Sequence, residues 1–525
     1  MKLRRIAAAL VIMSLGAAGF TFAAVRGQMA DCRITEKTIV GDAAAAAGLT
    51  ASFGMGLQNQ LYWKNVYTYG GADDGADVQE TTFSRKNPFP ADQKGPVPYV
   101  RLTGYMTTSS TLDFLLTDPA EGDPTRQALL KQLRREFFAE GASERVQEIK
   151  GVLPANGEQT QDLKLKELFR YYPIEGELTG TSVWAASLDN AVFASEDSAK
   201  LWQDINRFLR IPIPETESSG SSVGKYPDGS LNFNYYQGKE NCSQQEDHFD
   251  FYSIACSTPD AVYFTFNTHT DGGDVVDTSL IPGGYGLYRL PYDREKEIFL
   301  SEKLEMVYAL DPEKQYTDIY ASPDGAKLFL VSQAARLTAV GVKEVQATAE
   351  IIDVRTMQCD RREEIVCSEN TALGYDAGDY LIFRGRSELC LYTYQDGSYK
   401  KELMLENVDF RKPALRNLFY DHRCRTAYDG KRLSILGEAD FDIEDDDNTM
   451  WLWETAGTVE VAVLDASGLA YYGTLRSNMQ DFYDAKGYRA WEENVKPRDG
   501  AAKTYAHSST SALTGYLDKV IWLGI

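Results

Sequence analysis

The chain has 525 residues and a formal net charge of −23 at neutral pH. A surface with this charge repels nucleic-acid phosphates and anionic lipid headgroups, which excludes nucleic acid as an expected partner and peripheral attachment to a membrane. Hydrophobic residues make up 43% of the chain and charged residues 25%, as in globular proteins. The 31 tyrosines favour a fold rich in β-strands.

Residues 1–30 have the pattern of a membrane segment preceded by a short basic flank. After MKLRR, the run Ile6–Val25 holds 20 residues without a charge. A helix of that length covers a hydrocarbon layer of roughly 30 Å, and the basic flank predicts export of the remainder. Arg26 follows without a small-x-small cleavage site, so we expect a single-pass anchor with an extracytoplasmic main domain. The alternative is a cleaved signal peptide and a secreted protein.

Seven cysteines follow the membrane segment, and export would permit disulfides among them. Cys359 and Cys367 flank DRREEIV and are one candidate pair, and Cys242 and Cys256 are a second. The odd number leaves at least one thiol over, and ordinary unpaired core cysteines are the alternative interpretation.

Residues 31–120 and 121–210 differ in pattern. In the first segment, strands are predicted within 48–71, 78–85 and 99–116 from their β-branched and aromatic residues. The second segment is predicted to be a helical insertion, with helices from Asp123 to Gly141 and within 143–151, 162–172 and 195–209. Pro212–Gly224, rich in Ser and Gly, is expected to be a flexible connector.

Residues 211–525 contain a repeated pattern centred on aspartate turns. Four such turns, at Asp260, Asp324, Asp376 and Asp429, are separated by 64, 52 and 53 residues. Asp and Gly tolerate left-handed backbone conformations, so an Asp-Gly pair between apolar runs indicates a tight hairpin. The last three units each predict four strands, which lie within 317–367, 371–406 and 425–475.

Four strands per unit in a repeated series are typical of a β-propeller. The stretch IYASPDGAKLFLVS resembles the Ser-Pro-Asp-Gly repeat of TolB-type and other WD-like bacterial propellers. The anchor, GDAAAAAGLT and LYWKNVYTYGG also resemble uncharacterised membrane-anchored proteins of Gram-positive bacteria, a family that implies no activity. We therefore expect a mainly β protein with about seven four-stranded blades, six or eight being alternatives. Residues 31–120 would supply the first blades, and the C-terminal strand YLDKVIWLGI would close the ring.

Two motifs resemble catalytic or metal-binding sequences. Gly220–Gly224 matches the Gly-x-Ser-x-Gly nucleophile elbow at Ser222, but an elbow needs a strand before it and a helix after it. The loop NTHTDGGDVVD offers oxygen ligands for calcium, although its spacing matches no EF-hand and a solvated loop is the simpler interpretation. The loop's candidate ligands are Asn267, His269, Asp271, Asp274 and Asp277.

The densest acidic cluster lies in EADFDIEDDDNTM. Its candidate calcium ligands are Asp440, Asp442, Asp445 and Asp447. Packed carboxylates repel one another unless a cation or solvent screens them, so a solvated loop tip is the alternative to a calcium site. The four histidines are far apart in sequence, and we identify no catalytic residue and no further cofactor.

Two functions are consistent with these patterns. The first is a monomeric binding module, in which the propeller engages an extracellular protein or a glycan. The second is a hydrolase or lyase that degrades an extracellular polymer in the propeller channel. Propellers host both functions, so the fold does not decide between them.

Overall fold

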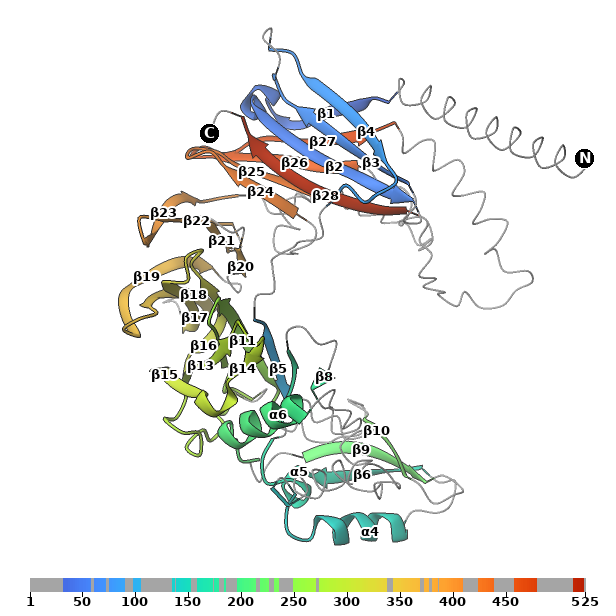
Figure 1. Cartoon of the computed structure of the whole chain (residues 1–525), viewed down its shortest axis with the longest axis vertical. Helices are drawn as coiled ribbons and strands as arrows, with labels where there is room; N and C mark the ends of the chain where they lie inside the picture. The colour runs from blue at the N-terminus through green and yellow to red at the C-terminus, as the bar shows by residue number, and fades with distance from the viewer. Residues whose placement is uncertain are drawn as a thin grey trace, which may run out of the picture. The chain divides into compact units, whose positions relative to one another are not determined.

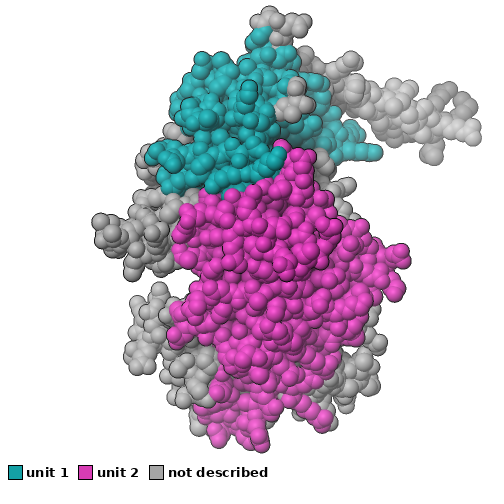
Figure 2. All heavy atoms as spheres, turned by 90° about the vertical axis from the view of Figure 1, so that its left-hand side faces the viewer, with its two compact units in different colours: residues 1–93, 373–393, 400–525 teal, residues 94–372, 394–399 magenta. Residues whose placement is uncertain are grey.

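The computed structural model describes 32–57, 61–71, 75–89, 98–104, 135–136, 138–152, 158–172, 174–178, 184–185, 196–213, 218–225, 231–235, 249–270, 273–337, 343–368, 373–376, 380–385, 387–408, 424–438, 458–478 and 513–523. The described chain is mainly β (Figure 1). It divides into unit 1 (residues 1–93, 373–393 and 400–525) and unit 2 (residues 94–372 and 394–399), which Figure 2 shows in different colours.

Unit 2 contains an eight-stranded sheet, which we call the β11 sheet. Its centre is an antiparallel series in which each strand pairs with its predecessor: β11 (Phe251–Thr258), β12 (Ala261–Phe266), β13 (Gly286–Asp293) and β15 (Glu305–Ala309). The remaining members are β14 (Ile298–Phe299), which pairs with β13, and β5 (Val100–Gly104), β7 (Glu175–Leu178) and β8 (Trp184–Ala185), which extend the sheet beyond β11. The 3-10 turn η3 (Ser301–Lys303) precedes β15.

The second large sheet of unit 2, the β16 sheet, has four antiparallel strands in chain order. They are β16 (Gln315–Ala321), β17 (Lys327–Leu337), β18 (Lys343–Asp353) and β19 (Gln358–Ser368). The four strands that the sequence predicts here are confirmed. Apolar residues on both faces of β17 are buried, including Leu328, Phe329 and Leu330, so this strand is covered on both sides.

One apolar core joins the β11 sheet, one face of the β16 sheet and helix α6 (Glu196–Phe208). Leu201 and Ile205 recur at helical spacing and are buried in this core, which explains why the sequence forms a helix there. The prediction of this helix is confirmed. Helix α4 (Ala142–Val152) confirms the prediction within 143–151, whereas the longest predicted helix, from Asp123, lies largely outside the described residues.

A three-stranded sheet of unit 2 corrects two predictions. Its order is β10 (Leu231–Tyr235), β9 (Ser218–Lys225) and β6 (Glu158–Lys164). The expected connector Pro212–Gly224 is therefore largely strand β9, because backbone pairing with both neighbours orders a segment whose Ser and Gly composition gives no sign of it. The helix predicted within 162–172 is reduced to one turn, α5 (Leu165–Leu168), directly after β6.

Unit 1 contains three antiparallel sheets, each named here by its first strand. The β20 sheet consists of β20 (Leu373–Asp376), β21 (Tyr380–Arg384), β22 (Leu389–Gln395) and β23 (Ser398–Leu405), whose connecting turn, residues 394–399, belongs to unit 2. The β24 sheet consists of β24 (Cys424–Tyr428), β25 (Leu433–Glu438), β26 (Thr458–Asp465), β27 (Gly468–Ser477) and β1 (Ile34–Gly41). The β28 sheet has the order β28 (Leu513–Trp522), β2 (Leu49–Leu57), β3 (Leu61–Thr68) and β4 (Val78–Ser84).

Segments from both ends of the sequence complete the sheets of unit 1. β28 pairs antiparallel with β2, and β1 pairs antiparallel with β27. The 3-10 turn η1 (Ala43–Ala46) joins β1 to β2. One core lies between the β24 and β28 sheets, and another lies between the β20 and β24 sheets, so successive sheets pack face to face. The strands predicted within 371–406, 425–475, 48–71 and 78–85 are confirmed.

The predicted membrane segment lies outside the described chain, and one predicted disulfide is wrong. The proposed membrane segment Ile6–Val25 lies outside the described residues, and none of the helices within them is long and apolar enough to span a bilayer. The candidate disulfide between Cys359 and Cys367 is wrong. Both residues lie in strand β19, eight positions apart, and an extended strand separates them by about 26 Å. Cys359 is a free thiol, and Cys242 of the other candidate pair is outside the described chain.

Candidate functional site

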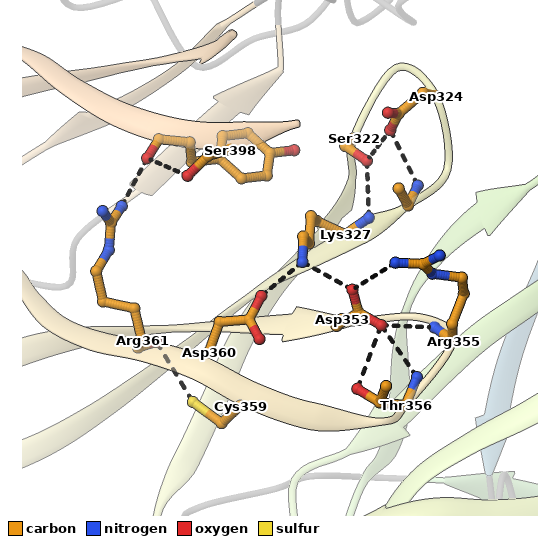
Figure 3. A network of polar contacts seen from close by, with 12 residues as sticks. Ser322, Asp324, Lys327, Asp353, Arg355, Thr356, Cys359, Asp360, Arg361 and Ser398 are labelled. Carbon is orange, nitrogen blue, oxygen red and sulfur yellow. Dashed lines mark hydrogen bonds and ion pairs between the residues drawn. The ribbon is translucent and has the colours of Figure 1, made fainter. Parts of the chain in front are cut away.

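The Ser-Pro-Asp-Gly motif forms the turn between β16 and β17. Asp324 Oδ1 accepts hydrogen bonds from Ser322 Oγ at 2.7 Å and from the Ala326 backbone N–H at 3.0 Å (Figure 3). Ser322 Oγ in turn accepts from the Lys327 N–H at 2.9 Å, and Gly325 adopts a positive φ of 69°. These bonds, together with one from the Tyr394 hydroxyl, hold the pKa of Asp324 below its usual value despite its desolvation.

The turn at Asp429, between β24 and β25, is built differently. Asp429 Oδ1 accepts from the Arg432 N–H at 2.6 Å, and the Asp429 N–H donates to the Arg432 carbonyl oxygen. Ser322 forms the same pair of bonds with Lys327, through its hydroxyl oxygen and its backbone N–H. The counterpart of Asp429 is therefore Ser322 rather than Asp324. Asp260 lies in the corresponding turn between β11 and β12, where its side chain is 84% exposed and 3.4 Å from Arg294. Each of these three turns connects the first two strands of a predicted repeat unit. The side chains of Ser322, Asp324 and Asp429 stabilise their turns by hydrogen bonds to the backbone.

A polar network continues from the Ser-Pro-Asp-Gly turn across the β16 sheet. Lys327 Nζ lies 2.8 Å from Asp353 Oδ2 and 2.6 Å from Asp360 Oδ2 (Figure 3). Asp353 Oδ1 also accepts from the backbone N–H groups of Arg355 and Thr356, both at 3.0 Å. Lys327, together with the backbone N–H and the hydroxyl of Thr356, holds the pKa of Asp353 far below its usual range. Every oxygen of Asp353 thus has a partner, which makes this network a structural one.

Glu350 of β18 lies in a second network, on the face of the β16 sheet that meets the β11 sheet. Its side chain is 3% exposed, and its carboxylate accepts from the Tyr308 hydroxyl at 2.8 Å and from Arg362 at 3.2 Å. Lys314 Nζ lies 3.8 Å away. Desolvation and this carboxylate raise the pKa of Tyr308 to about 12. Two cations and a phenol thus surround one buried acid, and the group joins the β11 sheet to the β16 sheet.

Asp318 of β16 differs from these acids. It is half-buried, and its Oδ1 accepts from the Tyr320 hydroxyl at 3.2 Å. Burial raises the pKa of this carboxyl, and the hydroxyls of Thr317 and Tyr320 only partly oppose the rise. Within the described chain it forms no ion pair with a lysine or arginine. A desolvated acid without a counter-ion is destabilising for the fold and is a candidate for a functional role.

One feature of the sequence marks the position of Asp318. Aspartate is depleted in β-strands, and the predicted strand TDIYA carries one between β-prone residues. An acid at such a position needs a partner, a solvent path or a ligand, but the sequence alone does not say which.

The loop after β12 uses several of its proposed calcium ligands in the fold. Asn267 Oδ1 accepts from the Tyr316 N–H at 2.8 Å, and Asp277 Oδ1 accepts from the Ser279 N–H at 2.9 Å. The backbone of His269 forms a β-bridge with Val275, while Asp271 lies outside the described residues. The described part of the chain contains no group of three or more His, Cys, Asp or Glu side chains placed to hold a metal ion.

The remaining candidates lie in a strand or outside the described chain. Ser222 is inside strand β9, paired with Asn234 and Thr160, so the Gly-x-Ser-x-Gly match is not a strand–turn–helix elbow. The four acids of the proposed calcium cluster are outside the described residues, as are three of the four histidines. These acids are Asp440, Asp442, Asp445 and Asp447.

Comparison with known proteins identifies no family. No family model and no curated protein matches the chain. The chain is similar to an acylaminoacyl peptidase of Pyrococcus horikoshii, at 12% identity and a TM-score of 0.22, over 52% of this chain and 37% of the peptidase. It is also similar to a putative 6-phosphogluconolactonase of Bacteroides uniformis (12% identity, TM-score 0.21, 51% of this chain and 69% of that one). A puromycin-hydrolysing peptidase of Mycobacterium tuberculosis gives 12% identity and a TM-score of 0.20, over 82% of this chain and 54% of that one. The likeness assigns no activity to this chain.

Proposed function

We propose that the chain is a propeller-like binding protein that engages an extracellular glycan or protein through the first strands of its sheets. The supporting observation is the arrangement of consecutive antiparallel sheets, in which strands of neighbouring sheets lie side by side. In unit 2 the first strands β11 and β16 lie side by side, and in unit 1 β24 lies beside β28. In a propeller, the inner strands of neighbouring blades lie side by side around a common axis, and ligands bind near that axis.

The exposure of the strands agrees with this proposal. β12 and the central part of β17 are buried, whereas β11 and β16 are half-buried along most of their length. Tyr252 of β11 is 46% exposed, and Asp318 of β16 forms no ion pair with any lysine or arginine among the described residues. First strands therefore offer an aromatic ring and a carboxylate to a ligand, as sugar and peptide sites commonly do.

The proposed location follows from the sequence. Ile6–Val25 would anchor the chain in the cell membrane with its remainder outside the cytoplasm, and secretion after cleavage is the alternative. The mass of the protein isolated from its membrane fraction distinguishes the two. A mass that includes residues 1–25, with resistance to alkaline extraction, supports the anchor, and a mature protein that starts after Val25 contradicts it.

Binding is tested with the full chain in detergent on arrays of bacterial-surface glycans and of peptides. A ligand that binds the wild type should bind Tyr252→Ala at least tenfold more weakly. Met404→Ala is the matched control, because Met404 is 42% exposed on the fourth strand of the β20 sheet. Equal loss in both variants, or none in Tyr252→Ala, would contradict a site on the first strands. Release of shortened glycans or peptides during the assay would show the hydrolase or lyase alternative.

A further inference from the structure

Strand β4 lies at an edge of the β28 sheet and directs backbone groups away from that sheet. Within the described chain it pairs with β3 alone (Figure 1). The N–H of Tyr69, the residue after β3, donates to Leu49 of β2, so the odd-numbered residues of β3 bond β2 and the even-numbered ones bond β4. Even residues of β3 pair with even residues of β4. The N–H and C=O groups of Gln79, Thr81 and Phe83 therefore point to the open edge.

The edge strands β1, β19 and β23 carry features that hinder pairing with another chain. The charged run Asp360–Glu364 lies in β19, an irregularity interrupts the ladder of β1, and Lys400 and Lys401 lie in β23. Strand β4, with the sequence VQETTFS, has no proline, no lysine and no irregularity in its ladder. Its residues at the open edge are uncharged, and its Val78 is 45% exposed. This edge is therefore suited to accept another strand.

The sequence around β4 is complementary to itself in one antiparallel register. A two-fold axis at Thr81, the central residue of β4, pairs residues at equal distances on its two sides. Asp77 and Arg85 directly flank the strand and are both exposed, so opposite charges meet at each end of the paired strands. Glu80 then lies opposite Thr82 of the second copy. The open backbone groups face one another, and no like charges are directly opposed.

Neighbouring registers are less favourable. An axis at Glu80 places this residue opposite its own copy, and like charges directly opposite each other are destabilising. An axis at Thr82 places Gln79 rather than Asp77 opposite Arg85, which removes the pairs of opposite charge. A shift by an odd number of residues would set open backbone groups against groups already bonded to β3. Charge and backbone geometry thus select the axis at Thr81.

We propose that two copies of the chain form a symmetric dimer in which β4 pairs antiparallel with β4 of the second copy, so that the two β28 sheets become one continuous sheet. A second copy is favoured over a different protein because the segment 77–85 supplies both members of each charge pair. The dimer differs from the monomer expected from the sequence, and it does not depend on the ligand proposed above.

The experiment is sedimentation velocity of the full chain in detergent over a wide range of protein concentration. We expect a dimer that dissociates on dilution. Thr82→Glu places a second acid opposite Glu80 at two symmetric positions and should weaken the dimer at least tenfold. Adding Glu80→Lys to this variant turns both contacts into pairs of opposite charge and should restore the dimer. Thr82 is exposed and pairs with Lys64 of β3, so a glutamate there is compatible with the fold.

The matched control is Ser398→Glu, which adds the same charge to an exposed position of the edge strand β23 and should leave the dimer unchanged. Thermal unfolding of each variant establishes that it is folded. A monomer at every concentration overturns the proposal. A dimer that Thr82→Glu leaves intact forms through another surface and also overturns it. Failure of Glu80→Lys to restore the dimer overturns the axis at Thr81. Ligand binding on the arrays and its loss in Tyr252→Ala test the proposed function separately.

Discussion

The guanidinium carbon of Arg432 lies 3.8 Å from the ring centroid of Trp522, although the two residues belong to different sheets of unit 1. Arg432 also donates to Asp429 Oδ2 at 2.8 Å and to the carbonyl oxygens of Ala45 and Ala47, at 2.9 and 3.3 Å. One side chain therefore joins the turn before β25 to the C-terminal strand β28 and to the segment that precedes β2. The guanidinium thus donates to the Asp429 carboxylate and to two backbone oxygens from a single planar group.

We predict that Arg432→Ala lowers the stability of unit 1 by about 1–2 kcal/mol, through loss of the ring contact and of these hydrogen bonds. Arg432→Lys should recover little, because an ammonium cannot form the same set of directed bonds. Denaturant unfolding followed by tryptophan fluorescence measures the change. Lys431→Ala, at the exposed neighbouring position, is the control and should change stability by less than about 0.5 kcal/mol. A similar effect in both variants would contradict the role assigned to Arg432.

Glu350 provides a second test, on unit 2. Glu350→Gln keeps the shape of the side chain but leaves Lys314 and Arg362 without their shared buried acid. We expect a loss of about 1 kcal/mol, because the amide accepts the hydrogen bonds of Tyr308 and Arg362 less strongly, while solvent compensates Arg362, whose side chain is 61% exposed. The pKa of Tyr308 should fall from about 12 but stay above its usual value, because burial is the larger cause of its shift. Thermal unfolding and a spectroscopic tyrosine titration measure the two effects. Glu313→Gln, at an exposed position, should change neither.

Asp353 predicts a pH dependence of stability. Its folded-state pKa lies below the unfolded value, so the ionised form contributes stability above the unfolded pKa, and this contribution is lost as the pH falls through the folded pKa. Asp353→Asn should therefore unfold at a lower temperature than the wild type at pH 7. The difference should shrink steadily below about pH 4. A difference in melting temperature that stays constant between pH 7 and pH 2.5 would show that the Lys327 ion pair is not its source.

Asp318 predicts the opposite pH dependence of stability. Because its folded-state pKa is raised, the ionised carboxylate destabilises the fold at neutral pH, and the penalty disappears below the unfolded pKa. We expect Asp318→Asn to raise the melting temperature by about 1–2 °C at pH 7 and by nothing near pH 3. A gain in stability together with a loss of ligand binding would be the signature of a residue kept for function. A fall in melting temperature at pH 7 would mean that the carboxylate has a structural partner.

The sequence predicted the strands of the last three units because each combines an apolar run with an Asp-centred turn. The sequence aligned the turns by their aspartates, but Asp429 occupies the position of Ser322. A Ser hydroxyl and an Asp carboxylate can each accept the backbone N–H at that position, so residue type alone does not align the turns. Strand β9 was missed because backbone pairing, rather than side chains, orders its Ser and Gly residues. Asp318 was missed because desolvation depends on neighbours that are distant in sequence.

The pairing of β28 with β2 has a consequence for synthesis on the ribosome. Residues 49–57 emerge early, and their partner, residues 513–522, is made only after more than 450 intervening residues. At typical elongation rates this delay is on the order of a minute. During that time one edge of β2 has no partner in the nascent chain and is open to pairing with other polypeptides. We therefore expect a chaperone that shields strand edges to be needed until translation ends.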